Sequence, residues 1–347
     1  MRLVKIIFLM FFLAAVSVCV CHFSGLRRLP IPDNKWLWIQ HVLHDQPPME
    51  VDYAFIGSSR TWCAVRSRQI EEARPGQRIW NLGRHWIGRD IDYLLLEQLL
   101  ARHRVRHVFV EIIGQEKFAP HAYAKYLVTP ENVFEEAGYH LSRLRPADYL
   151  TCSSQAKEVT KHLLSYSAEL SVRWYKSLLT TGWLAVSGDR HRAAAVEAYE
   201  KSGGFYTRDN QVQPRPDFVE RYGRFQPFFP VSKGPYLLPP ESFPDYYLHR
   251  MRTLADRHGT ELSFIFISDF GAVLPNNQAF GRYRDMGDVY FPSLRRLYHS
   301  ELWRDKNHLY GSGAVVLTDE IIRLLEEGAA ASEEMGQYVP VVENNVK

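Results

Sequence analysis

Ser59, Asp305 and His308 are the residues of this sequence whose types and spacing suit nucleophilic chemistry. Ser59 follows the apolar run "DYAFIG" at residues 52–57 and belongs to the polar segment "SSRT". In "LWRDKNHLYGSGA", Asp305 precedes His308 by three residues, just before a helix that we expect to start near Tyr310. At that spacing in a loop, the carboxylate can hold one imidazole nitrogen while the other accepts a hydroxyl proton. The pattern therefore predicts a serine nucleophile, its base and an orienting carboxylate.

The segments around these residues have the pattern of an α/β domain. Apolar runs of strand length occur at 51–57, 78–83, 105–114 and 261–268, and a helical pattern at 89–103 separates the second run from the third. Short runs that are apolar on both faces and alternate with helices are typical of a parallel sheet covered on both sides. We therefore expect a flavodoxin-like three-layer sandwich.

In the flavodoxin-like strand order, the loops after the first and third strands meet at one crevice, where ligands bind. Those loops are "GSSRT", which contains Ser59, and "GQEKF", which contains Gln115. His85 and Asp269 are further candidates for this crevice. Arg60 is either an anion contact or a solvated side chain.

Composition excludes several function classes. The chain has 347 residues, of which 46% are hydrophobic, so it can bury a sizeable core. Its net charge is only +3, without a block of about five or six like charges, so we expect no nucleic-acid partner. The C-x2-C and H-E-x-x-H spacings, the phosphate-binding loop and the G-x-S-x-G motif are absent from the sequence, so we expect no metal or other cofactor.

The N-terminus has the pattern of a membrane anchor. Residues 6–26 carry no formal charge, and a helix of that length matches the hydrocarbon core of a bilayer. A cleaved signal peptide is the alternative, because Arg2 and Lys5 form a short basic region, but no A-x-A cleavage site follows. We favour an uncleaved helix over 1–26, whose orientation the flanking charges do not determine.

The remaining boundaries follow from composition. Residues 27–50 are rich in proline and are expected to form a juxtamembrane linker with one short helix around "NKWLWIQHVLH", before a folded domain at 51–330 that starts near Val51. The region at about 117–240 combines helical patterns with segments rich in proline and aromatic residues. We interpret it as an insertion after the third strand, with a separate small domain as the alternative. Residues 331–347 are expected to be a disordered tail.

Two cysteines lie outside the apolar N-terminal segment, at Cys63 and Cys152. If the domain is exported, they could form a disulfide that ties the insertion to the helix after Ser59. The alternative is two separate buried thiols.

Four segments in order give the chain a family resemblance. "FIGSSRT", "NLGRHWIG", "VEIIGQE" and "DKNHLYGSGA" resemble the four blocks of SGNH, or GDSL-type, hydrolases, spread over roughly residues 51–328. The last block, with the long insertion before it, is similar to the membrane-anchored branch of that family. This branch includes the D-alanyl transfer protein of teichoic-acid operons and proteins of polysaccharide O-acetylation.

The resemblance implies roles for particular residues. Ser59 would be the nucleophile, with its backbone N–H in the oxyanion hole, His308 the base and Asp305 its orienting partner. A glycine N–H of the second block, from Gly83 or Gly88, would also hold the oxyanion. Gln115 stands where the family usually has asparagine, and Ser58 where it usually has aspartate.

The resemblance also implies a function. We expect an extracytoplasmic serine esterase or O-acyltransferase, anchored in the cytoplasmic membrane with its domain in the periplasm. It would act on a cell-surface polysaccharide through an acyl-serine intermediate. An acylated glycan or acyl donor and a membrane-bound O-acyltransferase would be its partners. The alternative is a scaffold of the same fold without turnover, which binds a glycan or partners that acyltransferase.

Overall fold

The computed structural model describes most of the α/β domain. The described residues are 34–85, 88–112, 243–270, 280–293, 295–297 and 299–327, with isolated positions between 121 and 197. The sheet and its helices belong to the compact unit formed by Asp33–Phe118 and Ala195–Lys347. Several expected features lie outside the described residues: the apolar segment 6–26, Gln115, Cys152, most of the insertion at 117–240 and the tail at 331–347.

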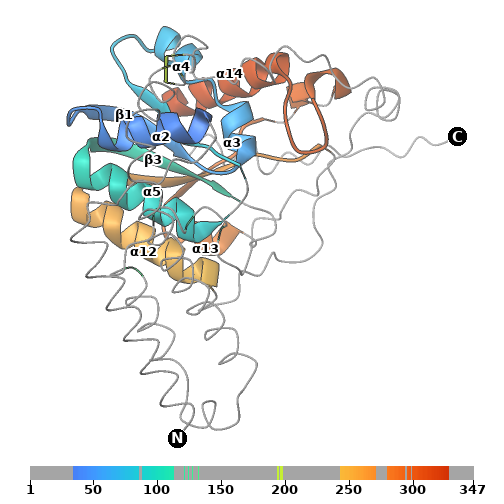
Figure 1. Cartoon of the computed structure of the whole chain (residues 1–347). Coiled ribbons are helices and arrows are strands. Elements are labelled where there is room, and N and C mark those ends of the chain that lie inside the picture. Colours follow the sequence, from blue (N-terminus) through green and yellow to red (C-terminus); the bar gives the residue numbers. More distant parts are fainter. Residues whose placement is uncertain are drawn as a thin grey trace, which may run out of the picture. The chain divides into compact units, whose positions relative to one another are not determined.

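The sheet has five parallel strands in the order β2-β1-β3-β4-β5 (Figure 1). The strands are β1 (Glu50–Ile56), β2 (Ile79–Asn81), β3 (Arg104–Ile112), β4 (Glu261–Phe266) and β5 (Asp288–Tyr290). Phe55 of β1 lies opposite Asn81 of β2 and Phe109 of β3. The α/β class and the parallel sheet are thereby confirmed, and the strand order is that of flavodoxin-like folds. β5 was not expected, because its segment contains no apolar run of strand length.

Helices cover both faces of the sheet. They are α2 (Asn34–His44), α3 (Ser59–Ala64), α4 (Ser67–Ala73), α5 (Arg89–Arg102), α12 (Phe243–His258), α13 (Gly281–Arg284) and α14 (Gly311–Glu327), with short 3-10 turns η3 (Arg295–Leu297) and η4 (Ser300–Leu302). α5 and α12 lie side by side on one face, and α14 packs with α3 and α4 on the other (Figure 1). The sheet therefore forms a layer between two layers of helices.

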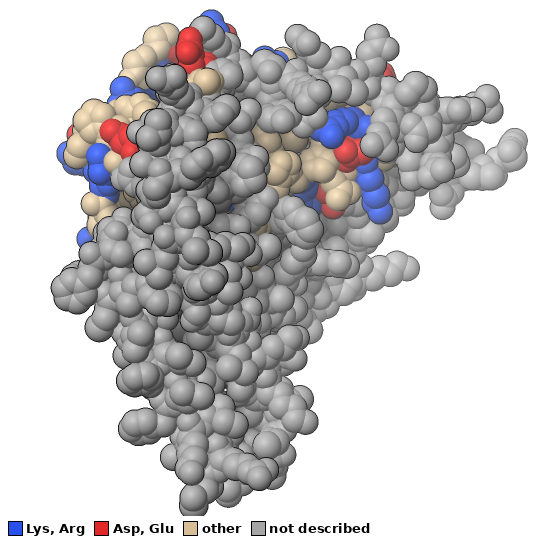
Figure 2. Space-filling model, in the orientation of Figure 1, with Lys and Arg blue, Asp and Glu red and all other residues tan. Residues whose placement is uncertain are grey.

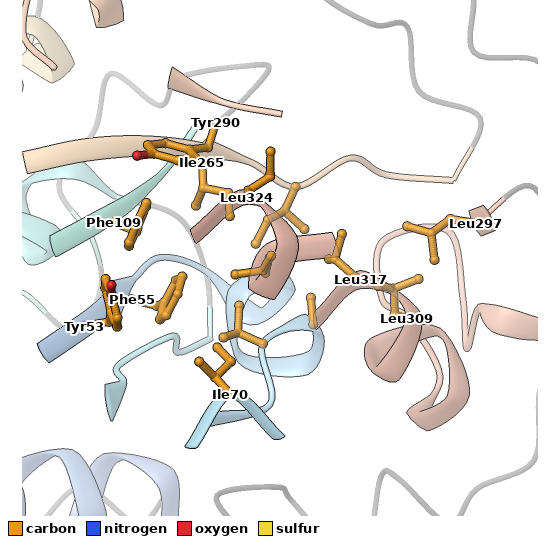
Figure 3. Close-up of a cluster of buried hydrophobic side chains, with 14 of the residues drawn as sticks. Tyr53, Phe55, Ile70, Phe109, Ile265, Tyr290, Leu297, Leu309, Leu317 and Leu324 are labelled. Carbon is orange, nitrogen blue, oxygen red and sulfur yellow. The ribbon is translucent and has the colours of Figure 1, made fainter. Parts of the chain in front are cut away.

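A hydrophobic core fills the space between the sheet and α14 (Figure 3). Phe55, Phe109 and Ile265 come from three neighbouring strands and meet Leu317 and Leu324 of α14. Side chains alternate between the two faces of a strand, whereas positions seven apart share one face of a helix. This packing holds α14 against that face of the sheet.

The helix α2 corrects the expected start of the folded domain. We expected a linker over 27–50 and a domain starting near Val51. Instead, Trp36, Ile39 and Leu43 of α2 are at most 1% exposed, and the helix packs against α5. These residues recur at helical spacing and form one apolar face, which the sheet domain buries. The folded unit therefore begins before Val51.

Within the described ranges, no helix has both the length and the apolar character needed to cross a bilayer.

On the face shown in Figure 2, basic and acidic side chains of the described residues lie next to one another. Charges of opposite sign are therefore interspersed on the part of this face that the structure describes.

Candidate active site

Ser59 stands where the central strand β1 passes into a helix. β1 ends at Ile56, Ser58 is the N-cap of α3, and Ser59 is the first residue of that helix. The side chain of Ser58 accepts a hydrogen bond from the backbone N–H of Arg60 at 3.1 Å, which is the usual role of a serine cap. The strand therefore delivers Ser59 to the carboxyl end of the sheet, beside β3, where ligands bind in this strand order.

The structure brings Ser59, His308 and Asp305 together. Ser59 Oγ lies 2.8 Å from His308 Nε2, although the two residues are 249 positions apart in the chain. His308 Nδ1 lies 2.8 Å and 3.0 Å from the two carboxylate oxygens of Asp305. A carboxylate only accepts, so Nδ1 carries the proton and Nε2 presents its lone pair to the serine hydroxyl. All three residues are half-buried.

A tight loop holds Asp305 and His308. Asp305 Oδ1 accepts the backbone N–H groups of Asn307 at 2.9 Å and His308 at 3.0 Å, as aspartates do in turns. The loop is closed where Trp303 and Leu309, both in the core, pair as an antiparallel bridge. Burial alone would raise the pKa of Asp305, but the hydrogen bonds from His308 and Asn307 hold that pKa below its usual value. The carboxylate is therefore charged and fixed in place.

Glu111, at the end of β3, holds the turn that carries Ser59. Its carboxylate accepts hydrogen bonds from Ser58 N at 2.7 Å, Ser58 Oγ at 2.9 Å, Thr61 Oγ1 at 2.6 Å and Arg60 Nε at 2.7 Å. Glu111 was not among the predicted site residues. A single acidic residue within the apolar run "VFVEII" was the signal that could have found it, because unpaired carboxylates are almost never fully buried.

Charge and hydrogen bonds keep this buried cluster ionised. Burial alone would raise the pKa of Glu111, but Arg60 and the donors on Thr61 and Ser58 lower it. Burial alone would lower the pKa of Arg60, but Glu111 and Asp269 raise it. Arg60 Nη1 contacts Asp269 Oδ1 at 3.1 Å. Arg60 is therefore buried and paired, so the interpretation of Arg60 as a solvated side chain is wrong.

The two candidate glycines of the second block have different surroundings. The backbone N–H of Gly83 donates to Asn81 Oδ1 at 2.9 Å, and a Cβ at this position would lie 2.4 Å from Trp62 N. Gly83 therefore allows the close approach of α3, and its donor is already engaged. Gly88 caps α5, and its carbonyl accepts from Asp92 N at 3.3 Å.

The backbone N–H of Ser59 lies at the N-terminus of α3. The first N–H groups of a helix have no partner within that helix. Among the described residues, none accepts a hydrogen bond from this group. It therefore fits the oxyanion role that we expected, whereas Gln115, the other expected donor, lies outside the described residues.

Arg84 is a second residue whose role the sequence did not indicate. Its Nη1 donates to Gly57 O at 2.7 Å, and its Nη2 donates to Gly88 O at 3.2 Å. An ion pair with Asp92 at 2.8 Å balances its charge. The guanidinium thus ties the loop after β2 to the end of β1, just before the serine turn. His85, a crevice candidate, packs its ring against Trp62 of α3 at a centroid distance of 4.7 Å.

In the part of the chain that the structure describes, no group of three or more His, Cys, Asp or Glu residues could hold a metal ion.

Comparison of the sequence with models of known protein families and with curated proteins found no match. What the site can do therefore follows from its own geometry. The hydroxyl of Ser59, the imidazole of His308 and the carboxylate of Asp305 are linked in a row by hydrogen bonds. In this arrangement the imidazole can take the proton of the serine hydroxyl.

Proposed function

We propose that this protein is a serine esterase or O-acyltransferase of the SGNH type. The observation that carries the proposal is the 2.8 Å contact between Ser59 Oγ and His308 Nε2, with Nδ1 of the same ring on Asp305. A serine hydroxyl is a weak nucleophile unless an adjacent base removes its proton, and this chain of three groups provides the base together with the carboxylate that orients it.

The reaction proceeds through an acyl-serine. Ser59 Oγ attacks the acyl carbon of an ester while its proton passes to His308 Nε2, and Asp305 stabilises the imidazolium. The tetrahedral intermediate collapses, the ester C–O bond breaks, and the leaving alcohol takes the proton from His308. In the second half, a sugar hydroxyl or water gives its proton to His308 while its oxygen attacks the acyl carbon. The bond between that carbon and Ser59 Oγ then breaks, His308 returns the proton to Ser59 Oγ, and the acylated sugar or the free acid is released.

The oxyanion of each tetrahedral intermediate needs hydrogen-bond donors. The Ser59 N–H is one, and we assign the others to Gly88 and to the side-chain amide of Gln115. Gly83 is the weaker of the two glycine candidates, because its N–H already donates to Asn81. Loss of one such donor lowers the rate by about 100-fold to 1000-fold in well-studied cases. Gln115→Ala is expected to lower the rate by about 10-fold to 1000-fold. The range is wider because the side chain of glutamine is longer than that of asparagine, which changes the reach of the amide donor.

The cellular setting is part of the same proposal. The uncharged segment 6–26 would anchor the protein in the cytoplasmic membrane, with the catalytic domain on the periplasmic side. The substrate would be an acylated cell-surface polysaccharide or an acyl donor, and a membrane-bound O-acyltransferase would be a partner. The resemblance of the four sequence blocks to the membrane-anchored SGNH branch supports this setting.

A second candidate is a scaffold of the same fold that binds a glycan or the acyltransferase without turnover. The observation that favours it is Gln115, which stands where the family usually has asparagine. The two candidates differ in one measurable property, the reactivity of Ser59.

Labelling with a fluorophosphonate probe tests the proposal. Such probes phosphonylate an activated serine, so the wild-type protein should be labelled, with the modified peptide mapped to Ser59 by mass spectrometry. Ser59→Ala should not be labelled. Ser312→Ala is the matched control, since it removes an exposed serine hydroxyl on α14 and should still be labelled. A folded wild-type protein that takes no probe would reject the enzyme and favour the scaffold.

A further inference from the structure

Asp269 connects the turn that carries Ser59 to the loop that carries His308. Asp269 follows β4, and its Oδ1 accepts a hydrogen bond from Arg60 Nη1 at 3.1 Å. The backbone N–H of the next residue, Phe270, donates to Lys306 O at 2.8 Å. Lys306 lies between Asp305 and His308 in the tight loop. A continuous set of contacts therefore runs from the residue after Ser59 to the loop of its base.

We propose that Asp269 is a positioning residue that fixes the distance between Ser59 Oγ and His308 Nε2. The inference rests on the proposed function, because the distance matters for a reaction only if Ser59 is the nucleophile. Among the described residues, the side chain of Asp269 contacts Arg60 and neither of these two atoms. It acts through Arg60 on one side and through the backbone of Phe270 on the other.

Arg60 is a rigid point of attachment for Asp269. Its Nε donates to Glu111, whose side chain has no exposed surface, and its own side chain is only 10% exposed. One cation thus stands between two carboxylates, a buried one at the end of β3 and a partly exposed one after β4. If Arg60 moved away from either carboxylate, a shielded charge would lose its partner, which is unfavourable. The three side chains are therefore expected to keep this arrangement.

The loop of His308 benefits from a contact near its tip. The core residues Trp303 and Leu309 hold its two ends, and Leu302 O accepts Tyr310 N at 2.7 Å. The bond from Phe270 reaches the middle of the loop, at Lys306. Catalysis is sensitive to such placement, because a shift of about 1 Å can reduce a rate by about 100-fold. Loss of the contact through Asp269 is therefore expected to lower the reaction rate rather than the stability of the whole domain.

Asp269 is distinct from the acid that orients His308. Nδ1 of His308 already has Asp305 at 2.8 Å and 3.0 Å, so that position is filled. The carboxylate of Asp269 faces the Arg60 guanidinium instead. Its loss is therefore expected to leave the proton path intact and to loosen the geometry around it.

The test uses the full chain in three variants. Asp269→Asn removes the charge with little change of shape, Asp269→Glu keeps the charge, and Asp256→Asn is the control. Asp256 pairs with Arg252 at 2.8 Å on the exposed side of α12, a helix that covers the opposite face of the sheet from α3 and α14. Each variant is measured in two ways, by the maximal rate and half-saturating concentration of fluorophosphonate labelling and by hydrogen exchange of the amides at Phe270 and 304–308.

We expect Asp269→Asn to lower the maximal labelling rate by about 10-fold to 100-fold with little change in the half-saturating concentration. Amides at Phe270 and 304–308 should exchange faster, while amides of the central strand β1 keep the exchange rates of the wild type. Asp269→Glu should recover part of the rate, and Asp256→Asn should match the wild type in both measurements. A merely structural role would instead accelerate exchange across the core.

Two outcomes separate this inference from the proposed function. If the wild type is labelled and Asp269→Asn equals it in rate and exchange, the inference is overturned and the function stands. If the wild type is not labelled, the proposed function fails. Hydrogen exchange then decides the linkage alone, since unchanged exchange in Asp269→Asn overturns it and local acceleration at 304–308 supports it.

Discussion

Glu111 Oε2 accepts a hydrogen bond from the backbone N–H of Ser58 at 2.7 Å, although the Glu111 side chain has no exposed surface. A charged group in the core thereby holds the main chain one residue before the candidate nucleophile. The same carboxylate binds Arg60 and Thr61, so a single residue of β3 organises the whole turn after β1. The stability of the fold and the geometry of the site are therefore linked at this point.

Glu111→Gln is expected to lower the free energy of unfolding by about 3 to 5 kcal/mol, because it leaves Arg60 buried without its closest charge partner. Urea denaturation measures the effect. Glu72→Gln is the matched control, since Glu72 pairs with Arg68 at 2.9 Å on the surface. Exposed pairs contribute about 1 kcal/mol or less. Equal losses in the two variants would contradict a special role for Glu111.

His107 predicts a dependence of stability on acid. Burial lowers its pKa to about 4, with Arg106 as a second cause, and its Nε2 lies 2.8 Å from Ser263 Oγ. Glu261 on β4 approaches Nδ1 at 3.5 Å, and the rings of Tyr53 and Tyr290 lie against it from β1 and β5. In the unfolded chain the histidine takes a proton at about pH 6.5, whereas in the fold it does so only near pH 4.

The unfolded state therefore binds more protons between about pH 6.5 and pH 4, and stability falls as the pH is lowered through that window. The loss that His107 contributes is at most about 3 kcal/mol. His107→Phe should flatten this part of a curve of unfolding free energy against pH. His258→Gln, an exposed position at the end of α12, should keep the slope of the wild type. An unchanged slope in His107→Phe would contradict the assignment.

Gly57→Ala tests the close approach at the end of β1. A Cβ there would lie 2.2 Å from Thr61 Oγ1 and 2.5 Å from Glu111 Oε2, so the cluster around Glu111 must shift. We expect a loss of about 1 to 3 kcal/mol in unfolding free energy, together with slower fluorophosphonate labelling. Gly281→Ala is the control, because nothing lies within 4 Å of its added Cβ. If Gly57→Ala behaves like Gly281→Ala, the turn is more tolerant than its packing indicates.

The three catalytic candidates should fail as a unit. Ser59→Ala and His308→Ala are each expected to abolish turnover of a simple acyl ester, since the hydroxyl and its base act in one step. Asp305→Asn should reduce turnover by about 10000-fold or less, because an amide favours the wrong imidazole tautomer. Combining two of these substitutions should add little to the loss. Additive losses in the double variants, measured by ester hydrolysis, would argue against a triad.

Local patterns in the sequence were enough to predict the main elements and one half of the site. The apolar runs predicted β1 to β4, and the helical spacing at 89–103 predicted α5, because burial on both faces and helical periodicity are visible in short windows. The three-residue spacing of Asp305 and His308 predicted their contact, since a single turn brings such neighbours together. The helix after them starts at Gly311, one residue from the expected position.

Long-range contacts depended on the fold. The contact of Ser59 with His308, the burial of Arg60 on Glu111 and the bond from Arg84 to Gly57 O each join residues that come together only in the folded sheet. The apolar face of α2 packs on α5, and this partner surface exists only once the domain has folded. Sequence alone determined which residues could do chemistry, because residue type and local spacing are read directly. Strand order and register decided which of them meet, because hydrogen bonds require atoms to lie within about 3 Å of each other.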